Sequence, residues 1–301
     1  MHTKALPYVG LLGLMWGTNL VVMRVGVGQF DPMVFVGVRL LLSSLAFVLV
    51  YTFSGRRLIP TDRKLWLYAT FLGVFSTAIP MTAVVSSLTF QSSGVTALLI
   101  TAAPAYITIA AHFFLPDEQI NLRKLLGVFL ALGGAALIVL RGESGLPDVA
   151  KGSPIGYALV MSAMLFETVG TILIRRRMQQ FSAFDVTAVR LTVAGLTVMP
   201  VAILLRGFDL SQVTGSGWFS LIYATLIGAF SAQILAFNIT KRFGATAFSL
   251  TSYVIPVVAA VTGVLWLNET ITLWMLLGMV LIGGGILLIN GRRSLRLMPN
   301  P

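Results

Sequence analysis

Two residues of opposite charge lie inside long apolar runs, where an uncompensated charge is costly and therefore points to a role. Glu167 lies about eight residues, or roughly 12 Å along a helix, from the nearest basic loop. Its carboxylate could bind the ammonium group of a substrate or carry a coupling proton. Arg190 lies at a similar depth in the next run. The two side chains could therefore form a structural ion pair instead.

Arg39 is a third charged residue within an apolar run, and no acid stands at a matching depth beside it. Its guanidinium could bind backbone carbonyls at a helix end, or its apolar stem could extend toward the membrane interface. It could also bind a substrate carboxylate. We therefore treat Glu167, Arg190 and Arg39 as the residues where a mechanism should be sought.

Uncharged polar and aromatic residues within other runs are candidates for the wall of a binding cavity. Trp16 and Asn19 lie three residues apart, so they share one face of a helix. Asn19 needs a hydrogen-bond partner in hydrocarbon, and the Trp16 ring could bind an apolar or cationic group. Both could equally be packing residues. Gln233 lies near the middle of its run and is a further cavity candidate.

Prolines interrupt three of the runs and could act as hinges. They are Pro80, Pro104 and Pro256. Hydroxyl-bearing residues precede two of these prolines and could either line the cavity or bond carbonyls that proline leaves free. They are Thr101, Ser252 and Tyr253.

The elements that must position these residues are membrane helices. Of the 301 residues, 57% are apolar and only 10% are charged, whereas a soluble domain is roughly a quarter charged. Ten runs approach the length of about 20 residues that crosses a bilayer. We expect them at 6–23, 32–53, 65–90, 92–115, 125–140, 154–174, 184–205, 218–240, 245–267 and 272–290. The fold is therefore predicted to be an all-α polytopic membrane protein.

The formal charge of +11 acts as an orientation signal rather than a nucleic-acid footprint, because most of the 21 Lys and Arg fall in short loops and tails on one side. The other side holds only Arg24, Arg141, Lys151 and Arg206. Basic loops stay in the cytoplasm. Both termini are therefore predicted to be cytoplasmic.

The second half of the chain repeats the first at a near-constant offset. Matching residues include Gln29 and Gln180, Arg39 and Arg190, Gly73 and Gly228, Pro104 and Pro256, and Glu118 and Glu269. Each half holds five spans, an odd number, so the second must enter the membrane inverted. Inverted repeats are typical of secondary transporters, although some channels and scaffolds also carry them. We predict a first repeat at 1–146 and a second at 147–301, which ends in a short basic cytoplasmic tail.

Glycines in the fifth and tenth spans predict that these two helices approach closely and hold the halves together. They are Gly127, Gly133, Gly134, Gly278, Gly283, Gly284 and Gly285. Glu118 and Glu269 each follow a loop residue that disfavours helix, and we expect them to cap the next helix.

Four motifs follow one another in a fixed order within residues 5 to 290. They are Trp16 to Asn19, Asp31-Pro32 followed by Arg39, Pro104 followed by Glu118, and Pro256 followed by Glu269. With them the chain resembles the EamA-type branch of the drug/metabolite transporter superfamily. The resemblance implies a ten-helix inner-membrane carrier, in most cases an exporter of amino acids or other small metabolites. It also implies a central cavity walled by spans 1, 3, 4, 6, 8 and 9. The second half departs from the first by carrying Phe166-Glu167 where the first has Trp16-Gly17.

We therefore expect a secondary transporter of the bacterial inner membrane that exports amino acids or related metabolites by alternating access. An exporter of drugs or other amphipathic solutes is the alternative. A membrane-embedded enzyme acting on lipid-linked substrates would need clustered acids, histidines or metal ligands, and the sequence has no Cys and only two His. No Gly-rich phosphate loop is present, so ATP hydrolysis is not expected. The expected partners are a small-molecule substrate and membrane lipids, without nucleic acid, metal or cofactor, and the protein is expected to be a monomer or weak homodimer.

Overall fold

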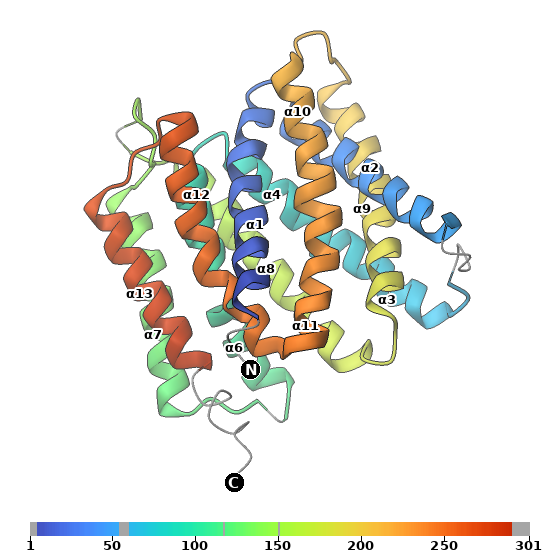
Figure 1. Cartoon of the computed structure of the whole chain (residues 1–301). Coiled ribbons are helices and arrows are strands. Elements are labelled where there is room, and N and C mark those ends of the chain that lie inside the picture. Colours follow the sequence, from blue (N-terminus) through green and yellow to red (C-terminus); the bar gives the residue numbers. More distant parts are fainter. Residues whose placement is uncertain (1–4, 54–59, 117, 150, 291–301) are drawn as a thin grey trace.

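The computed structural model describes residues 5–53, 60–116, 118–149 and 151–290, and these ranges contain helices and loops but no strand (Figure 1). Nine of the helical segments in them are long and apolar enough to cross a membrane, and a shorter apolar helix, Thr251–Leu267, occupies the ninth predicted span. The predicted all-α membrane fold is confirmed. We call the face at which α1 begins the inner face and the opposite face the outer face.

The first half contains five spans, of which the third and fourth are each built from more than one helical segment. The elements are α1 (Leu6–Val27), α2 (Pro32–Phe53), α3 (Arg63–Gly73), the π-helical segment η2 (Val74–Ala78), α4 (Ile79–Ser87), α5 (Ser93–Thr101), α6 (Ala103–Phe114) and α7 (Leu122–Arg141).

The second half repeats this order. Its elements are α8 (Pro154–Arg177), α9 (Ala183–Arg206), α10 (Gly215–Tyr223), the π-helical segment η3 (Ala224–Ser231), α11 (Ala232–Ser249), α12 (Thr251–Leu267) and α13 (Leu273–Asn290). The predicted division after residue 146 falls in the loop between α7 and α8.

The predicted prolines sit in three different settings. Pro80 lies in the first turn of α4, directly after η2, and Pro104 lies in the first turn of α6, directly after the break at Ala102. Pro256 lies inside a continuous α12. Proline lacks the N–H that a regular helix turn needs. A widened turn or a break on its N-terminal side accommodates that loss at Pro80 and Pro104.

One predicted boundary is wrong. We expected a break at Lys241 to Gly244, but α11 continues through Ser249 and the turn falls at Leu250. A lone glycine costs only about 1 kcal/mol relative to alanine in a helix, and no proline follows it. The helix therefore continues, and the ninth span is shorter than predicted.

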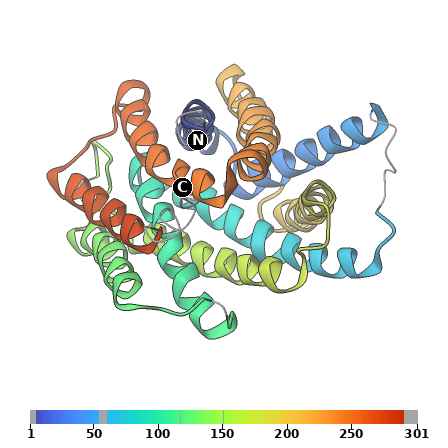
Figure 2. The same ribbon diagram turned by 60° about the horizontal axis from the view of Figure 1, so that its bottom comes forward.

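Two pairs of repeat-related helices make the most extensive contacts between the halves, and Figure 2 shows the first, α7 with α13, at one edge of the molecule. A β-carbon on Gly127 would lie 2.6 Å from the Gly285 oxygen, and one on Gly134 would lie 2.8 Å from the Gly278 oxygen. The predicted pairing of the fifth and tenth spans is therefore confirmed at these four glycines. The second pair is α2 with α9, which carries Arg39 and Arg190.

Not every glycine in these spans serves this contact. Gly133 and Gly284 have open space where a β-carbon would point, and the nearest atom to such a carbon on Gly283 is 3.9 Å away, in Tyr253. The expectation of close packing is wrong for these three positions, because they lie off the helix face that meets the partner.

The remaining spans form two bundles that exchange one helix between the halves. Bundle A holds α1 from the first half with α10, η3, α11 and α12 from the second. Bundle B holds α8 from the second half with α3, η2, α4, α5 and α6 from the first. Exchanging each span with its repeat counterpart converts one bundle into the other, as an inverted repeat requires.

Candidate functional site

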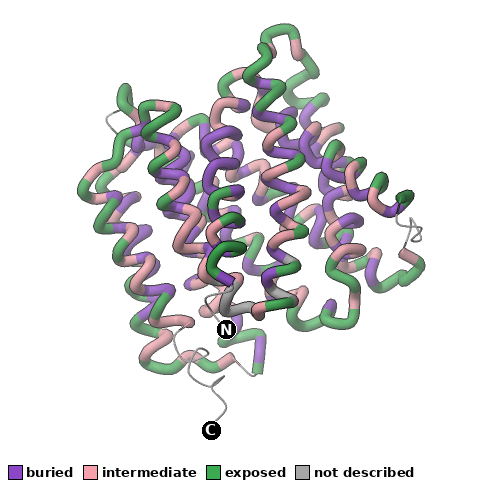
Figure 3. The backbone as a smooth tube through the Cα atoms, in the orientation of Figure 1, coloured by how far each residue is buried: buried purple, intermediate pink, exposed green. Residues whose placement is uncertain are grey.

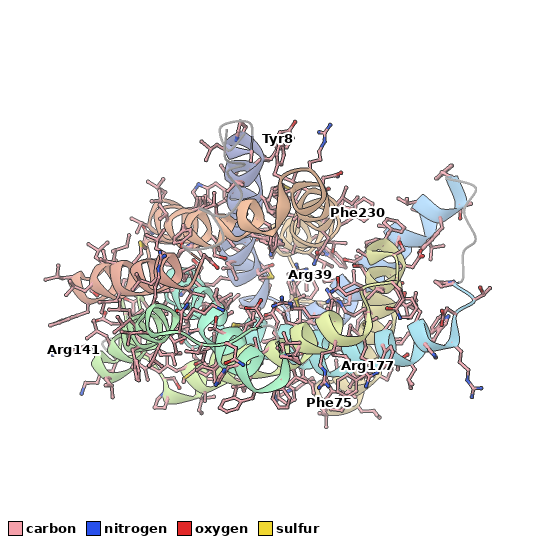
Figure 4. All side chains as sticks on the ribbon, turned by 90° about the horizontal axis from the view of Figure 1, so that it is seen from below. Tyr8, Arg39, Phe75, Arg141, Arg177 and Phe230 are labelled. Carbon is pink, nitrogen blue, oxygen red and sulfur yellow. The ribbon has the colours of Figure 1, made fainter. Side chains whose placement is uncertain are left out.

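Arg39 lies at the centre of the molecule seen from below (Figure 4), and its side chain is buried with 2% exposure. Its Nε donates a hydrogen bond to the main-chain oxygen of Ala224, the first residue of η3, at 3.1 Å. Its Nη1 contacts the sulfur atoms of Met23 at 2.9 Å and Met81 at 3.2 Å. Of the three roles considered for Arg39, the structure shows the carbonyl contact. Within the described residues no carboxylate forms a salt bridge with it.

Glu167 lies in α8 and Arg190 in α9, and both helices pack against η2. None of the salt bridges among the described residues joins Arg190 to Glu167, so no Arg190 nitrogen lies within 4.0 Å of the Glu167 carboxylate. The buried Arg190 Nε has no hydrogen-bond partner, and the Glu167 side chain is accessible although it lies well inside α8. The structure thus leaves both charged residues within their spans without a salt bridge between them among the described residues.

Trp16 and Asn19 both lie against η3. The Trp16 Nε1 donates to the main-chain oxygen of Gly228 at 3.2 Å, and its ring meets Phe248 edge-on at a centroid distance of 6.0 Å. Asn19 is buried, its Nδ2 contacts the Met23 sulfur at 3.7 Å, and its Oδ1 has no partner. A β-carbon on Gly228 would lie 2.0 Å from that Oδ1. The pair therefore joins the first span to the π-helical segment of the eighth.

The other predicted cavity residues are spread over three helices. Thr101 is buried at the end of α5 and donates to the Ala97 oxygen at 2.7 Å, so its hydroxyl is satisfied within its own helix. Gln233 is half-buried in α11. Ser252 and Tyr253 are half-buried in the first turn of α12, where the Tyr253 hydroxyl lies near the side chain of Asn290.

The expectation that Glu269 caps the next helix is wrong. Its carboxylate, buried at 2% exposure, pairs with Arg24 at the end of α1. It also accepts hydrogen bonds from Ser93 N and Oγ, both at 2.8 Å, and from Gly94 N at 3.2 Å. Glu269 thus caps α5, which lies in the other half of the chain. The Thr272 hydroxyl accepts from Met275 N and supplies the cap of α13 instead.

Glu118 does not cap the next helix either. It pairs with Lys124 at 3.1 Å and with Arg175 at 2.8 Å, while the Asn121 side chain accepts from Lys124 N and caps α7. The sequence pattern did not single out Arg24 as a site residue, because we expected it to lie in a loop. The signal was present, since Arg24 and Arg175 match in the repeat just as Glu269 and Glu118 do.

Known proteins resemble this chain over nearly its whole length. The "probable amino-acid metabolite efflux pump" of Salmonella typhimurium is 27% identical over 285 residues, covering 92% of this chain and 91% of that protein. The "uncharacterized transporter YoaV" of Bacillus subtilis is 23% identical over 91% of this chain and 92% of its own length. The "uncharacterized inner membrane transporter YedA" of Escherichia coli is 26% identical over 92% of this chain and 89% of its own length.

A crystal structure of a protein with 16% sequence identity superposes with a TM-score of 0.69 over 98% of this chain and 99% of the other, and it supports the fold alone. The EamA-like transporter family matches twice, at residues 3–140 and 154–291, so each half corresponds to one copy of the family's unit. The chain therefore belongs to the EamA-like transporter family and is a multi-pass membrane transporter.

Proposed function

We propose that this protein exports amino acids or related small metabolites across the bacterial inner membrane by alternating access, with its inner face and both termini in the cytoplasm. Family membership and the name of the Salmonella relative support the substrate class. The name of YedA supports the inner membrane. The basic residues of the inner loops support the orientation.

Two observations carry the substrate class: the Glu167 carboxylate is accessible within α8, and the Arg190 Nε in α9 is buried without a hydrogen-bond partner. Opposite charges inside a membrane protein are costly unless they are satisfied, and no salt bridge among the described residues satisfies either of these two. An amino acid in its zwitterionic form carries the two complementary charges. Its ammonium group would bind the accessible Glu167 carboxylate, and its carboxylate would bind the Arg190 guanidinium.

Arg39 is the weaker candidate for the substrate carboxylate, because its Nε is already engaged by the Ala224 oxygen. We assign it instead to holding α2 against η3. Trp16, Asn19 and Gln233 lie in bundle A, whereas Glu167 lies in bundle B. They are proposed to meet the side chain of the substrate.

An exporter of amphipathic drugs remains the second candidate, and one observation favours it. The Trp16 ring and Phe248 form an aromatic contact beside η3, and aromatic rings bind flat apolar or cationic solutes well. Such a substrate carries at most one of the two charges, so it would leave either Glu167 or Arg190 unsatisfied. Nothing in the described residues favours the enzyme alternative, since no group of three metal-binding or acidic side chains gathers among them.

The test is efflux of labelled amino acids from proteoliposomes that contain the purified protein. We expect saturable flux of at least one amino acid, lost in both Glu167→Gln and Arg190→Gln. Asp148→Asn, an exposed acid in the α7–α8 loop, is the matched control and should retain full flux. Drug flux without saturable flux of any amino acid would replace this proposal with the drug exporter.

A further inference from the structure

Two pairs of exposed basic residues lie at the inner face, one at the start of α3 and one at the end of α8. They are Arg63 with Lys64, and Arg176 with Arg177. The residue that follows the first pair, Leu65, and the residue that follows the second, Met178, are buried in one apolar cluster. This packing brings the two pairs to one part of the inner face, and we call these four basic residues the basic corner.

Acids at the inner face have other partners. Asp62 caps α3 by accepting hydrogen bonds from two amides of its first turn, at 2.7 and 3.2 Å. Asp185 accepts a hydrogen bond from the Tyr51 hydroxyl, and Glu118 binds two cations outside the basic corner. Within the described residues, no salt bridge includes any of the four basic side chains. Their charges are therefore available to an external anion.

An apolar stripe runs along α3 from the basic corner toward the middle of the span. Arg63 is followed at four-residue intervals by Leu67, Phe71 and Phe75, so the four side chains share one side of the helix. All three apolar residues are exposed, and the two phenylalanine rings lie 4.7 Å apart. Figure 3 draws exposed positions of α3 in green at the lower right of the view. A cation thus stands at the inner end of a surface suited to an acyl chain.

A second stripe of the same kind runs along α8. Leu165, Val169 and Arg176 are four and seven residues apart, so they share one helix face. All three are exposed, and Arg176 again occupies the inner end. The repeat therefore does not explain the pattern, since α3 and α8 come from different halves and occupy different places in them.

The two stripes lie beside each other where η2 contacts α8. Gly170 leaves no room for a β-carbon next to the Ser76 hydroxyl, so the two helices touch there. Their chain neighbours, Val169 and Phe75, are exposed. Seen from below, Phe75 and Arg177 lie on the same side of the molecule (Figure 4). The two apolar stripes and the basic corner therefore belong to one surface of bundle B.

We propose that this surface binds an anionic phospholipid, with the phosphate of the headgroup at the basic corner and the acyl chains along the two stripes. Arginine binds phosphate oxygens through two parallel hydrogen bonds, and basic residues near a membrane surface attract anionic lipids. With the inner face in the cytoplasm, as proposed above, the lipid belongs to the cytoplasmic leaflet. The site itself requires neither that orientation nor an amino acid as substrate.

The test compares positions on the inner face, because charges that only set the orientation act from any inner loop. The purified full-length protein is titrated in detergent with phosphatidylglycerol or phosphatidylethanolamine of identical acyl chains, and native mass spectrometry counts the bound lipids. We expect phosphatidylglycerol to bind more tightly. In Arg63→Gln with Arg177→Gln its affinity should fall roughly 25-fold, a factor of about five for each charge. The affinity for phosphatidylethanolamine should stay the same.

Arg123→Gln with Arg242→Gln is the matched control, since it removes two charges from the same face in α7 and α11. It should leave the affinity for phosphatidylglycerol nearly unchanged. Arg63→Lys with Arg177→Lys keeps both charges and should retain most of the affinity. The melting temperature of each variant reports its folding, and the two single glutamine variants replace the double variant if that one does not fold.

Three results would overturn the lipid site. Equal binding of the two lipids to the unsubstituted protein would show that the headgroup charge is not recognised. An equal loss in the control variant would show that charge acts from anywhere on the inner face. Displacement of phosphatidylglycerol by the same concentration of glycerol phosphate would show that a free phosphate binds there instead. No amino acid is present in these titrations, so their outcome is independent of the proposed function.

Discussion

Arg39 donates from Nε to the main-chain oxygen of Ala224, which ties the second span to the start of the π-helical segment in the eighth. The guanidinium is buried beside two methionine sulfurs and has no acidic partner among the described residues. This contact joins the two halves of the chain at the centre of the molecule.

Arg39→Ala should lower the thermal stability of the purified protein by the equivalent of about 2–4 kcal/mol, because it removes a buried side chain and a charged hydrogen bond. Arg39→Met fills most of the volume without a charge and should lose less, since an apolar residue of similar size replaces a buried charge at little cost. Thermal unfolding in detergent measures both. Unchanged stability in Arg39→Ala together with lost flux would assign Arg39 to the substrate instead.

Gly127→Ala should destabilise the protein by about 1–3 kcal/mol, the usual cost of overpacking, because its β-carbon would lie 2.6 Å from the Gly285 oxygen. Gly133→Ala lies on the same helix with nothing within 4 Å. It should be neutral or stabilising by up to about 1 kcal/mol, the gain in helix propensity. The comparison of the two melting temperatures isolates the α7–α13 contact. Equal effects at both positions would mean that this contact does not hold the halves together.

Gly228→Ala should also destabilise the protein, since its β-carbon would lie 2.0 Å from the Asn19 Oδ1. The clash is with one side chain, so the double variant Gly228→Ala with Asn19→Ala should recover most of the lost stability. Thermal unfolding of the two single variants and the double variant forms a complete cycle. Additive losses would show that the two residues do not meet in the folded protein.

A transport role and a structural role of Glu167 and Arg190 can be distinguished in the same way, by comparing single and double variants. If they bind substrate, Glu167→Gln and Arg190→Gln should each abolish flux, and the double variant should stay inactive while remaining folded. If they form a structural pair, each single variant should lose folded yield and the double variant should regain it, since removing one partner leaves an uncompensated charge within a membrane span. Size-exclusion yield and flux measured on the same preparations decide between the two.

The spans, their inverted order and the pairing of the fifth and tenth helices could be predicted from the sequence, because hydropathy, loop charge and glycine spacing are local signals. The turn at Leu250 could not, since the glycine at position 244 reads as a break but costs too little to end a helix. The partners of Glu118 and Glu269 were wrong for another reason. A loop glutamate beside a helix start suggests a local cap, whereas Glu269 caps a helix of the other half.

The relative placement of Glu167 and Arg190 could be predicted only in part. The depths of both residues follow from counting along two helices, so the sequence places them at one level. Whether their charged atoms touch depends on how far apart α8 and α9 are held by η2, which packs against both helices. That distance is a tertiary property, and no spacing within either helix encodes it.

Saturable efflux from proteoliposomes, measured with an amino acid and its two singly charged analogues as competitors, tests whether Glu167 and Arg190 bind the two charges of the substrate. The amino acid amide lacks the carboxylate, and the matching carboxylic acid lacks the ammonium group. We expect the unlabelled amino acid to compete strongly and each analogue to compete weakly, because each analogue leaves Arg190 or Glu167 unsatisfied. Equal competition by the amide, or the absence of saturable amino-acid flux, would contradict it.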